Sequence, residues 1–202
     1  MSRVARDIIE ALVLALVVFL LLQTTVRNFK VDGSSMDPTL EHGQYLLVNR
    51  LIYLRIDKER LAKIIPFWQS DDRSSNYAIR PPKRGEVIVF QFPRDISKDF
   101  VKRVVGLPGE VIEMRDGRVI VDGAVLEEPY LDPAAKDNSN KGEYRLKDGE
   151  YYVLGDNRTH SNDSRSWGPV PEANLKGKVW AVYWPIPGIQ ILNIMDRIPG
   201  VG

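Results

Sequence analysis

Three segments of the chain contain residue types that could carry out chemistry, and the first of them presents a serine. Ser35 lies in residues 33–40 (GSSMDPTL), where Gly33 can adopt positive φ and Pro38 restricts the backbone. A serine hydroxyl on such a restricted turn could be presented to a substrate as a nucleophile. An ordinary turn, or a cap at the start of a domain, explains the same composition and is the simpler interpretation of this segment alone.

The second segment, residues 102–109 (KRVVGLPG), places a lysine among apolar residues. Since side chains alternate between the two faces of a strand, Lys102 shares a face with Phe100 and Val104. Burial among such neighbours lowers the pKa of an amine, and only a neutral amine can take a proton from a serine hydroxyl near pH 7. The simpler interpretation of this segment alone is a lysine that reaches water from a half-exposed strand.

The third segment, residues 155–165 (GDNRTHSNDSR), is dense in side chains that hydrogen-bond to one another and can hold a loop rigid. It follows an apolar strand, as binding loops often do. A solvated surface loop is the alternative interpretation, although such loops usually contain fewer arginines.

Short stretches rich in β-branched and aromatic residues surround these segments and are typical of strands. The candidate strands are residues 44–52, 86–92, 100–105, 119–121, 151–154 and 178–184. Residues 110–121 predict a hairpin, because Asp116-Gly117 suits the turns that match strand twist. Evenly spaced short strands without long helical patterns predict a mainly β fold with an antiparallel core. The sequence also predicts a short helix at residues 57–65 and exposed loops at 71–76 and 132–142.

The first thirty residues differ from the rest, because residues 8–22 are apolar apart from Glu10. With residues 23–26 they form a segment of about 19 residues, or roughly 28 Å of helix, which just spans a bilayer core. A cleavable signal peptide would be followed by small residues, and a buried soluble helix would have a polar face. We therefore predict one N-terminal transmembrane helix. Basic residues flank both of its ends, so charge does not decide its orientation.

The composition argues against several other functions. The net charge is +1, whereas a nucleic-acid partner would require a basic excess. The chain has no cysteine, which removes a disulfide framework, a thiolate nucleophile and cysteine-bound zinc or iron–sulfur clusters.

Taken together, the segments resemble the type I signal peptidase family, the bacterial leader peptidases. The resemblance is carried by residues 33–40 as the nucleophile box, 84–90 (RGEVIVF) as the structural box, 102–109 as the general-base box and 155–165 as the last box. It covers nearly the whole chain except residues 54–82 and the tail after Pro187. Each box alone is moderately specific, and four boxes in order behind an apolar anchor are very specific.

The resemblance implies a serine–lysine dyad. Ser35 would attack the scissile carbonyl, Lys102 would take its proton and later protonate the leaving amine, and Ser161 would hydrogen-bond and orient the lysine. The backbone N–H of Ser35 would help to bind the oxyanion. One branch of the family has a serine at the position of Gly33 and uses its hydroxyl as a second oxyanion donor, so this donor is in doubt here.

The resemblance also implies supporting residues and an architecture. The supporting charged residues are Asp156, Asp163, Arg165 and Arg103, with Arg103 as a partner of Asp156. The implied fold is an antiparallel β catalytic core with a smaller β extension, preceded by one transmembrane helix. We place the stub and anchor at residues 1–30 and the catalytic domain at 31–202, with the extension at about 108–150.

The implied substrates are secretory preproteins, cleaved after small residues of the Ala-x-Ala type because shallow pockets exclude larger side chains. No metal or cofactor is implied, and the chain has only two histidines that could bind one. The expected partners are the preprotein and a lipid bilayer, which could be a cell membrane or a thylakoid membrane. The N-terminus would be cytoplasmic and the catalytic domain extracytoplasmic.

Three alternatives have to be distinguished from this interpretation. Ser35 could form a triad with His42 or His160 and an aspartate, although position 160 is a variable one in the family. A cytosolic self-cleaving repressor would share the serine–lysine chemistry, but the apolar anchor argues against it. A membrane-tethered β module that binds without cleaving would need no serine–lysine pair.

One apolar cluster has two interpretations of equal weight. Its members, Ile64, Ile65, Phe67 and Trp68, have a composition suited to the headgroup region of a membrane, near which the active site would have to work. They could equally pack into the core of the domain.

Overall fold

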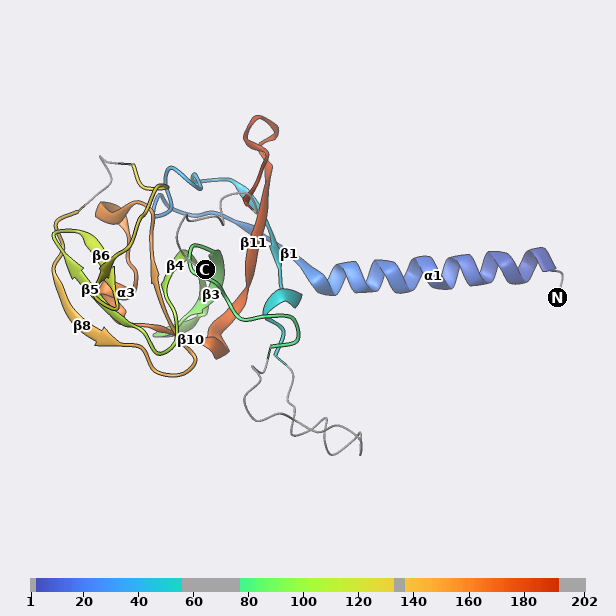
Figure 1. The fold of residues 1–202 in the computed structure, drawn as a ribbon. Coiled ribbons are helices and arrows are strands. Elements are labelled where there is room, and N and C mark those ends of the chain that lie inside the picture. The colour runs from blue at the N-terminus through green and yellow to red at the C-terminus, as the bar shows by residue number, and fades with distance from the viewer. Residues whose placement is uncertain (1–2, 56–76, 133–136, 193–202) are drawn as a thin grey trace, which may run out of the picture.

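The computed structural model describes residues 3–55, 77–132 and 137–192, and it confirms a mainly antiparallel β architecture. One long helix, α1 (Arg3–Thr25), precedes the strands and projects away from the β domain (Figure 1). The strands form a larger sheet of eight and a smaller sheet of four. Short helical turns connect them: η1 (Leu51–Tyr53), η3 (Arg158–His160), α3 (Ser164–Trp167), η4 (Glu172–Asn174) and η5 (Ile186–Gly188).

The larger sheet has the strand order β1-β2-β11-β3-β4-β9-β10, and β12 pairs with β11. Its strands are β1 (Val26–Lys30), β2 (Tyr45–Asn49), β3 (Val87–Phe92), β4 (Asp95–Gly106), β9 (Glu150–Leu154), β10 (Val170–Pro171), β11 (Leu175–Trp184) and β12 (Gln190–Ile191). Each of these strands pairs antiparallel with its neighbours. Five predicted strands are confirmed in this sheet, as β2, β3, β4, β9 and β11, although β4 and β11 begin earlier than the sequence indicates.

The smaller sheet has the order β7-β6-β5-β8 and lies between residues 108 and 150. Its strands are β5 (Val111–Arg115), β6 (Arg118–Val121), β7 (Ala124–Val125) and β8 (Lys141–Arg145). The predicted hairpin is confirmed as β5 and β6, with Asp116 at φ 48° and Gly117 at φ 73° between them. Positive φ at both central residues is what a type I′ turn requires, and aspartate and glycine tolerate it best.

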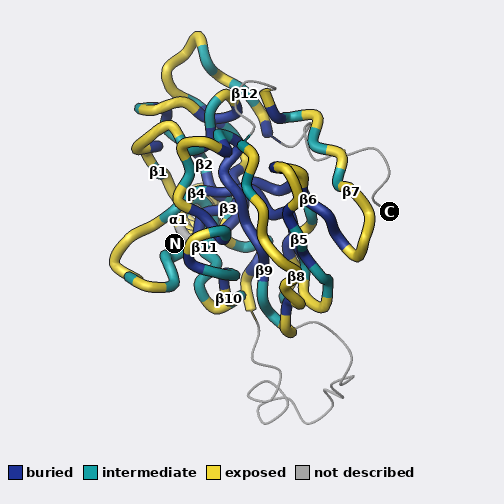
Figure 2. The backbone as a smooth tube through the Cα atoms, turned by 90° about the vertical axis from the view of Figure 1, so that its left-hand side faces the viewer, coloured by how far each residue is buried: buried dark blue, intermediate teal, exposed yellow. Residues whose placement is uncertain are grey.

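Side chains from both sheets share a core. Val105 and Leu154 of the larger sheet pack with Ile112 and Met114 of the smaller one, so the second sheet closes over one end of the first. Through the centre of the domain, β3 and β9 run mostly buried (Figure 2). β4 pairs with β3 as far as Arg103 and with β9 from Arg103 to Gly106. It is therefore held at Arg103 by a strand on each side.

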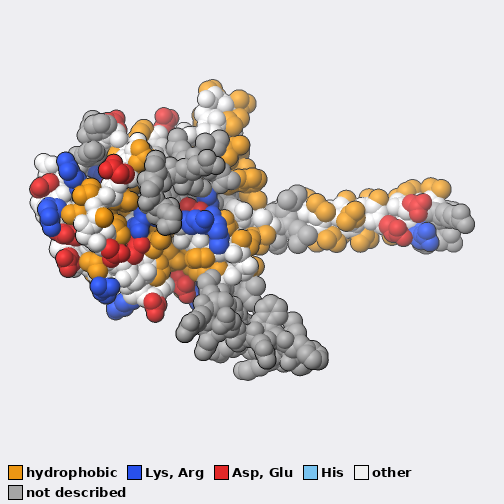
Figure 3. Space-filling model, in the orientation of Figure 1, with side chains coloured by type: hydrophobic (Ala, Val, Ile, Leu, Met, Phe, Trp, Pro, Cys, Tyr) orange, Lys and Arg blue, Asp and Glu red, His pale blue; other side chains and the backbone are white. Residues whose placement is uncertain are grey.

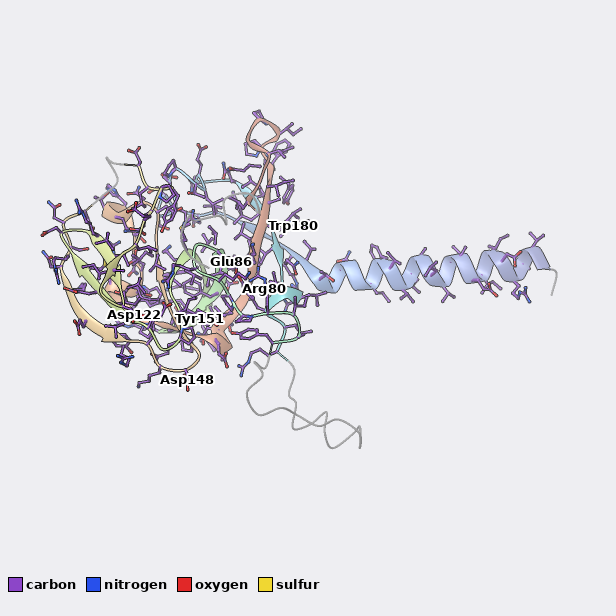
Figure 4. All side chains as sticks on the ribbon, viewed as in Figure 1. Arg80, Glu86, Asp122, Asp148, Tyr151 and Trp180 are labelled. Carbon is purple, nitrogen blue, oxygen red and sulfur yellow. The ribbon has the colours of Figure 1, made fainter. Side chains whose placement is uncertain are left out.

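A buried carboxylate fixes the start of β3. Glu86 accepts hydrogen bonds from the Tyr53 hydroxyl (2.6 Å) and the Lys83 N–H (2.9 Å), and it pairs with Lys178 (3.1 Å) and Arg80. Figure 4 shows Glu86 and Arg80 in the middle of the domain. Burial raises the pKa of Glu86, but the bonds from Arg80 and Tyr53 outweigh it, so the pKa is lowered overall. The charged network therefore ties η1, β3 and β11 together.

The apolar N-terminal segment forms the predicted helix, and many of its side chains, such as Leu12, Leu16 and Phe19, are exposed. Across the parts of the chain that the structure describes, no helix is both long enough and apolar enough to cross a membrane. The helix is thus confirmed, and its crossing of a membrane is not. Residues 26–30, which we placed with the anchor, instead form β1, because they pair with β2.

Three predictions lie outside the described residues: the short helix at 57–65, the apolar cluster at 64–68 and the exposed loop at 71–76. The loop expected at 132–142 is described only in part, and its end forms the first residues of β8.

Candidate active site

Ser35 lies in a loop between β1 and β2 that is closed at its base by two hydrogen bonds. The Val31 N–H donates to Gln44 O (2.8 Å), and the Gly43 N–H donates to Val31 O (2.9 Å). Met36, directly after the serine, is buried in the core and anchors the loop to it. The loop thus holds Ser35 half-buried at the wall of a cleft.

Lys102 reaches the serine from β4. Its side chain is 4% exposed, and its Nζ donates hydrogen bonds to Ser35 Oγ (2.7 Å) and to Val101 O (2.8 Å). As the alternation of the strand predicts, it lies near Phe100, with Nζ 5.5 Å from the ring centroid. Burial lowers the pKa of Lys102 to about 8, although the charges of Asp163 and Asp156 oppose this. The Lys102 amine can therefore lose its proton close to neutral pH.

The polar segment after β9 lies directly against the loop that carries Ser35. The Asn157 N–H donates to Ser35 O (3.1 Å). Gly155 makes this approach possible, because a Cβ at that position would lie 2.4 Å from Ser35 O and 2.2 Å from Ser161 Oγ. A larger residue would have to push the two segments apart.

The expected hydrogen bond between Ser161 and Lys102 is not formed. Ser161 Oγ is buried and has no hydrogen-bond partner among the described residues. The amine donates to Val101 O instead, since the carbonyl of the preceding residue is within reach. Ser161 is therefore brought to the site, beside Gly155, but it does not orient the amine in this structure.

The pair expected between Arg103 and Asp156 is present and fully buried. The guanidinium donates from Nε (2.9 Å) and Nη2 (2.6 Å) to the two carboxylate oxygens. It also donates from Nη1 to Gly85 O (2.7 Å). This bidentate pair links β4, next to Lys102, to the segment that contacts Ser35.

Asp163 and Arg165 form a second buried pair in the same segment. Arg165 donates from Nε (2.8 Å) and Nη2 (2.7 Å) to Asp163, and it also binds Asp137. Asp163 accepts a further hydrogen bond from the Gly155 N–H (3.0 Å). Asp163 therefore fixes the backbone at Gly155, which packs against the loop that carries Ser35.

Two residues that support the site were not predicted. Tyr130 places its ring 3.9 Å from the Arg103 guanidinium and donates its hydroxyl to Glu128 (2.6 Å). Glu128 also binds Arg158, with one contact of 3.1 Å. Both residues follow β7 of the smaller sheet. Glu128 lies 30 residues before Arg158, whereas Tyr130 lies after Arg103 in the sequence, and nothing in their local sequence indicates these contacts.

Neither histidine is hydrogen-bonded to Ser35. His160 Nδ1 lies 2.8 Å from Thr159 Oγ1, and His42 Nδ1 accepts a bond from the Gly33 N–H (3.0 Å). In the described structure, the group bonded to the serine hydroxyl is the Lys102 amine. The geometry therefore gives no support to a serine–histidine triad.

A cleft of about 730 Å³ opens beside Ser35. Residues 29–35 line one side of it and residues 98–102 the other, with Leu46 and Val89 also in its wall. Among the described residues, β4 pairs with β9 only from Arg103 onward, so the edge of β4 away from β3 is free of a strand partner beside the cleft. Such an edge can hydrogen-bond an extended peptide as an added strand. Within the described ranges, no group of three or more histidine or acidic side chains is arranged to hold a metal ion.

A buried amine bonded to a serine hydroxyl, beside a cleft with a free strand edge, is the kind of site expected in a peptidase. Comparison with known families agrees, because the model of the family "Signal peptidase, peptidase S26" matches residues 5–184. The chain belongs to this family of peptidases.

Individual relatives are similar over most of their length. A probable signal peptidase I-2 of Synechocystis is 32% identical over 191 residues, which cover 91% of this chain and 75% of the relative. Signal peptidase I of Bacillus caldolyticus is 35% identical over 170 residues, which cover 78% of this chain and 79% of the relative. A signal peptidase I crystal structure from Enterococcus faecalis V583 is 35% identical, covers 50% of this chain and 99% of that one, and has a TM-score of 0.44.

Proposed function

We propose that the protein is a serine endopeptidase in which Ser35 is the nucleophile and Lys102 is the general base. The observation that carries the proposal is the 2.7 Å hydrogen bond between the two side chains. The pKa of Lys102, which burial lowers to about 8, adds to it, because a base must be neutral to accept a proton.

In the proposed reaction, the neutral Lys102 amine accepts the hydroxyl proton while Ser35 Oγ attacks the scissile carbonyl. The ammonium then donates this proton to the departing amine, which leaves an ester between Ser35 and the substrate. Water attacks the ester while Lys102 takes its proton, and the ammonium then returns this proton to Ser35 Oγ as the bond to the acyl group breaks and the carboxyl product leaves. The Ser35 N–H would bind the oxyanion, whereas Gly33 has no hydroxyl to act as a second donor.

The supporting residues act by positioning. Arg103 and Asp156 hold β4 to the segment after β9, and Asp163 with Arg165 holds the backbone of that segment. Ser161 is assigned a related role, because its buried hydroxyl is close to the site and, among the described residues, uncommitted. It would accept a hydrogen bond from Lys102 once the amine carries the serine proton.

The proposed substrates are secretory preproteins, from which the enzyme removes the N-terminal signal peptide. An extended segment would pair with the free edge of β4, so that alternate side chains enter the cleft. We propose cleavage after small residues, of the Ala-x-Ala type, because shallow subsites exclude larger side chains. The catalytic domain would comprise residues 31–202 together with the strand β1.

We propose further that the protein works at a lipid bilayer, with the N-terminus cytoplasmic and the catalytic domain on the extracytoplasmic side. Two surfaces support attachment: the apolar side chains along α1 and those on the adjoining side of the domain. Figure 3 shows hydrophobic side chains along both. The second surface comprises Trp180, Trp184, Ile186, Ile189 and Ile191, each at least 45% exposed.

The decisive experiment is cleavage of a secretory preprotein that has Ala-x-Ala before its cut site. The wild type should release the mature protein, and Ser35→Ala and Lys102→Ala should each lose on the order of 10⁴-fold or more in rate. Both variants should unfold at the wild-type temperature. Substantial cleavage by folded Ser35→Ala would reject the mechanism, and no cleavage by the wild type would favour a binding module.

A further inference from the structure

His42 accepts a hydrogen bond from the backbone N–H of Gly33, which lies two residues before the proposed nucleophile Ser35. We propose that His42 is a positioning residue: by accepting the Gly33 N–H, it holds the backbone from which Ser35 is presented. This inference rests on the proposed role of Ser35 as nucleophile. It assigns His42 no contact with the substrate and no proton transfer.

The loop that carries Ser35, called here the nucleophile loop, has an unpacked position at Gly33. This residue has φ +96°, is exposed, and has no neighbouring atom within 4 Å of the position a Cβ would take, so packing does not hold it. Glycine also has the greatest backbone freedom of any residue. On either side the loop is tied down, at Val31 by its bond to Gln44 O and at Ser35 by the Asn157 N–H. The 3.0 Å bond from the Gly33 N–H to His42 Nδ1 holds the point between them.

The bond requires one protonation state of the imidazole. Nδ1 can accept only when it carries no proton, which means a neutral ring with its proton on Nε2. A protonated ring presents an N–H toward the Gly33 N–H, and two donors cannot bond. The Asp32 carboxylate, 3.5 Å from Nδ1, would accept from the charged ring instead. Protonation of His42 should therefore release Gly33.

Carboxylates are the other titratable groups around His42. Besides Asp32, they are Asp37 and Glu41 from the same loop. The pKa of Asp37 is raised by burial and by the charge of Glu41, while the charge of His42 opposes this. A change in the charge of His42 would therefore affect Gly33, before Ser35, through the lost hydrogen bond, and Asp37, after Ser35, through the charge interaction.

Substitution of His42 should leave the fold intact. The side chain is 66% exposed, so its loss empties no cavity. The loop keeps its buried anchors, Met36 and Leu40, and its bonds at Val31. A change in activity can therefore be separated from a loss of stability by measuring the unfolding temperature.

The test is the kinetics of the full-length chain on the preprotein. His42→Ala should lower kcat by about 2- to 10-fold, the range that one hydrogen bond of ordinary net strength gives, with little change in KM. His42→Asn should restore kcat, because the amide oxygen can take the place of Nδ1. His42→Gln, the matched control, reaches too far and should not restore it. Glu41→Gln should resemble the wild type.

The pH dependence separates positioning from a purely structural role. As the pH is lowered, the wild type should lose kcat/KM more steeply than protonation of Lys102 alone explains, because a protonated His42 ring cannot accept the Gly33 N–H. In His42→Asn, which keeps the acceptor but cannot charge, the slope of log kcat/KM against pH should return to about 1.

Three results would overturn the inference: wild-type kcat in His42→Ala, equal rescue by asparagine and glutamine, or an unchanged acid limb in His42→Asn. These failures can be told from failure of the proposed function. If folded Ser35→Ala still cleaves, the proposed function fails whatever His42 does. If Ser35→Ala is inactive while the His42 variants match the wild type, only the present inference fails.

Discussion

At the scale of single residues, the proposed chemistry depends on the surroundings of one amine. An unperturbed lysine has a pKa of about 10.4, so fewer than about one in a thousand is neutral at pH 7. Burial lowers the pKa of Lys102 to about 8, which makes roughly one in ten neutral at that pH. The strand that places Lys102 against Phe100 therefore increases the population of the reactive form by more than about a hundredfold.

The pH profile of kcat/KM should report this shift. Because the protonated amine cannot act as a base, activity should rise with pH through a midpoint near the value of about 8 to which burial lowers the pKa of Lys102. Lys102→Arg, whose guanidinium stays protonated, should be inactive across the range. A rising limb centred near 10 in the wild type would show that Lys102 is not desolvated when it acts.

Gly155 should be among the most sensitive positions near the site. In Gly155→Ala the new methyl group would lie 2.4 Å from Ser35 O, a backbone atom that cannot move without displacing Ser35. We expect kcat to fall by at least about tenfold, since small misplacements of reacting groups are costly. Gly142→Ala, where a Cβ meets nothing within 4 Å, is the matched control and should retain activity. Equal kinetics in the two variants would contradict this account of the contact.

At the scale of elements, one buried ion pair joins the two parts of the site. Arg103 comes from β4 and Asp156 from the segment after β9, and their side chains are 2% and 1% exposed. The neighbouring residues Lys102 and Asn157 both contact Ser35. The relative position of Lys102 and Ser35 therefore depends on a buried pair that does not line the cleft.

Removing one partner of this pair should destabilise the domain. Asp156→Asn keeps the shape but leaves the Arg103 charge buried without its counter-ion, which typically costs about 3–5 kcal/mol in the free energy of unfolding. Urea denaturation of both proteins would measure the difference. Arg115→Ala, which removes an exposed partner of Glu113, should change the unfolding free energy little. A small effect of Asp156→Asn would mean that other contacts hold the two elements together.

At the scale of the whole molecule, two apolar surfaces lie on the same side. α1 leaves the domain on the side where Trp180 projects from β11 (Figure 4). The hairpin of β11 and β12 adds Trp184, Ile186 and Ile191, all at least half exposed. Exposed apolar patches of this kind mark sites of association, and tryptophan is favoured at the membrane interface. The cleft beside Ser35 would then lie close to the bilayer surface.

Quenching of tryptophan fluorescence by brominated lipids would test this arrangement. With the full-length protein bound to liposomes, we expect clear quenching, which should fall sharply in the Trp180→Phe/Trp184→Phe double variant. Trp167 is buried and should contribute little. Trp68→Phe tests the apolar cluster predicted from the sequence in the same way. Undiminished quenching in the double variant would exclude this side of the domain as the lipid-facing one.

Local sequence was enough to predict several features of this protein. The turn at Asp116-Gly117 was predictable because few residue pairs tolerate positive φ twice in succession. The face that Lys102 shares with Phe100 was predictable from the alternation of side chains along a strand. This segment alone favoured a lysine that reaches water, so its burial was not predictable in the same way. The apolar strands β3 and β9 were recognisable because buried strands are rich in β-branched and aromatic residues.

Other features depended on partners that are distant in the sequence. β8 consists entirely of exposed residues and exists because β5 pairs with it. β1 was placed with the anchor, since only its pairing with β2 distinguishes it from the end of a helix. The 2.7 Å contact between Ser35 and Lys102, which are 67 positions apart, requires the whole sheet to be in register. The same holds for Ser161, whose hydroxyl has no hydrogen-bond partner among the described residues, because the packing of backbone segments decides which groups come within hydrogen-bond distance.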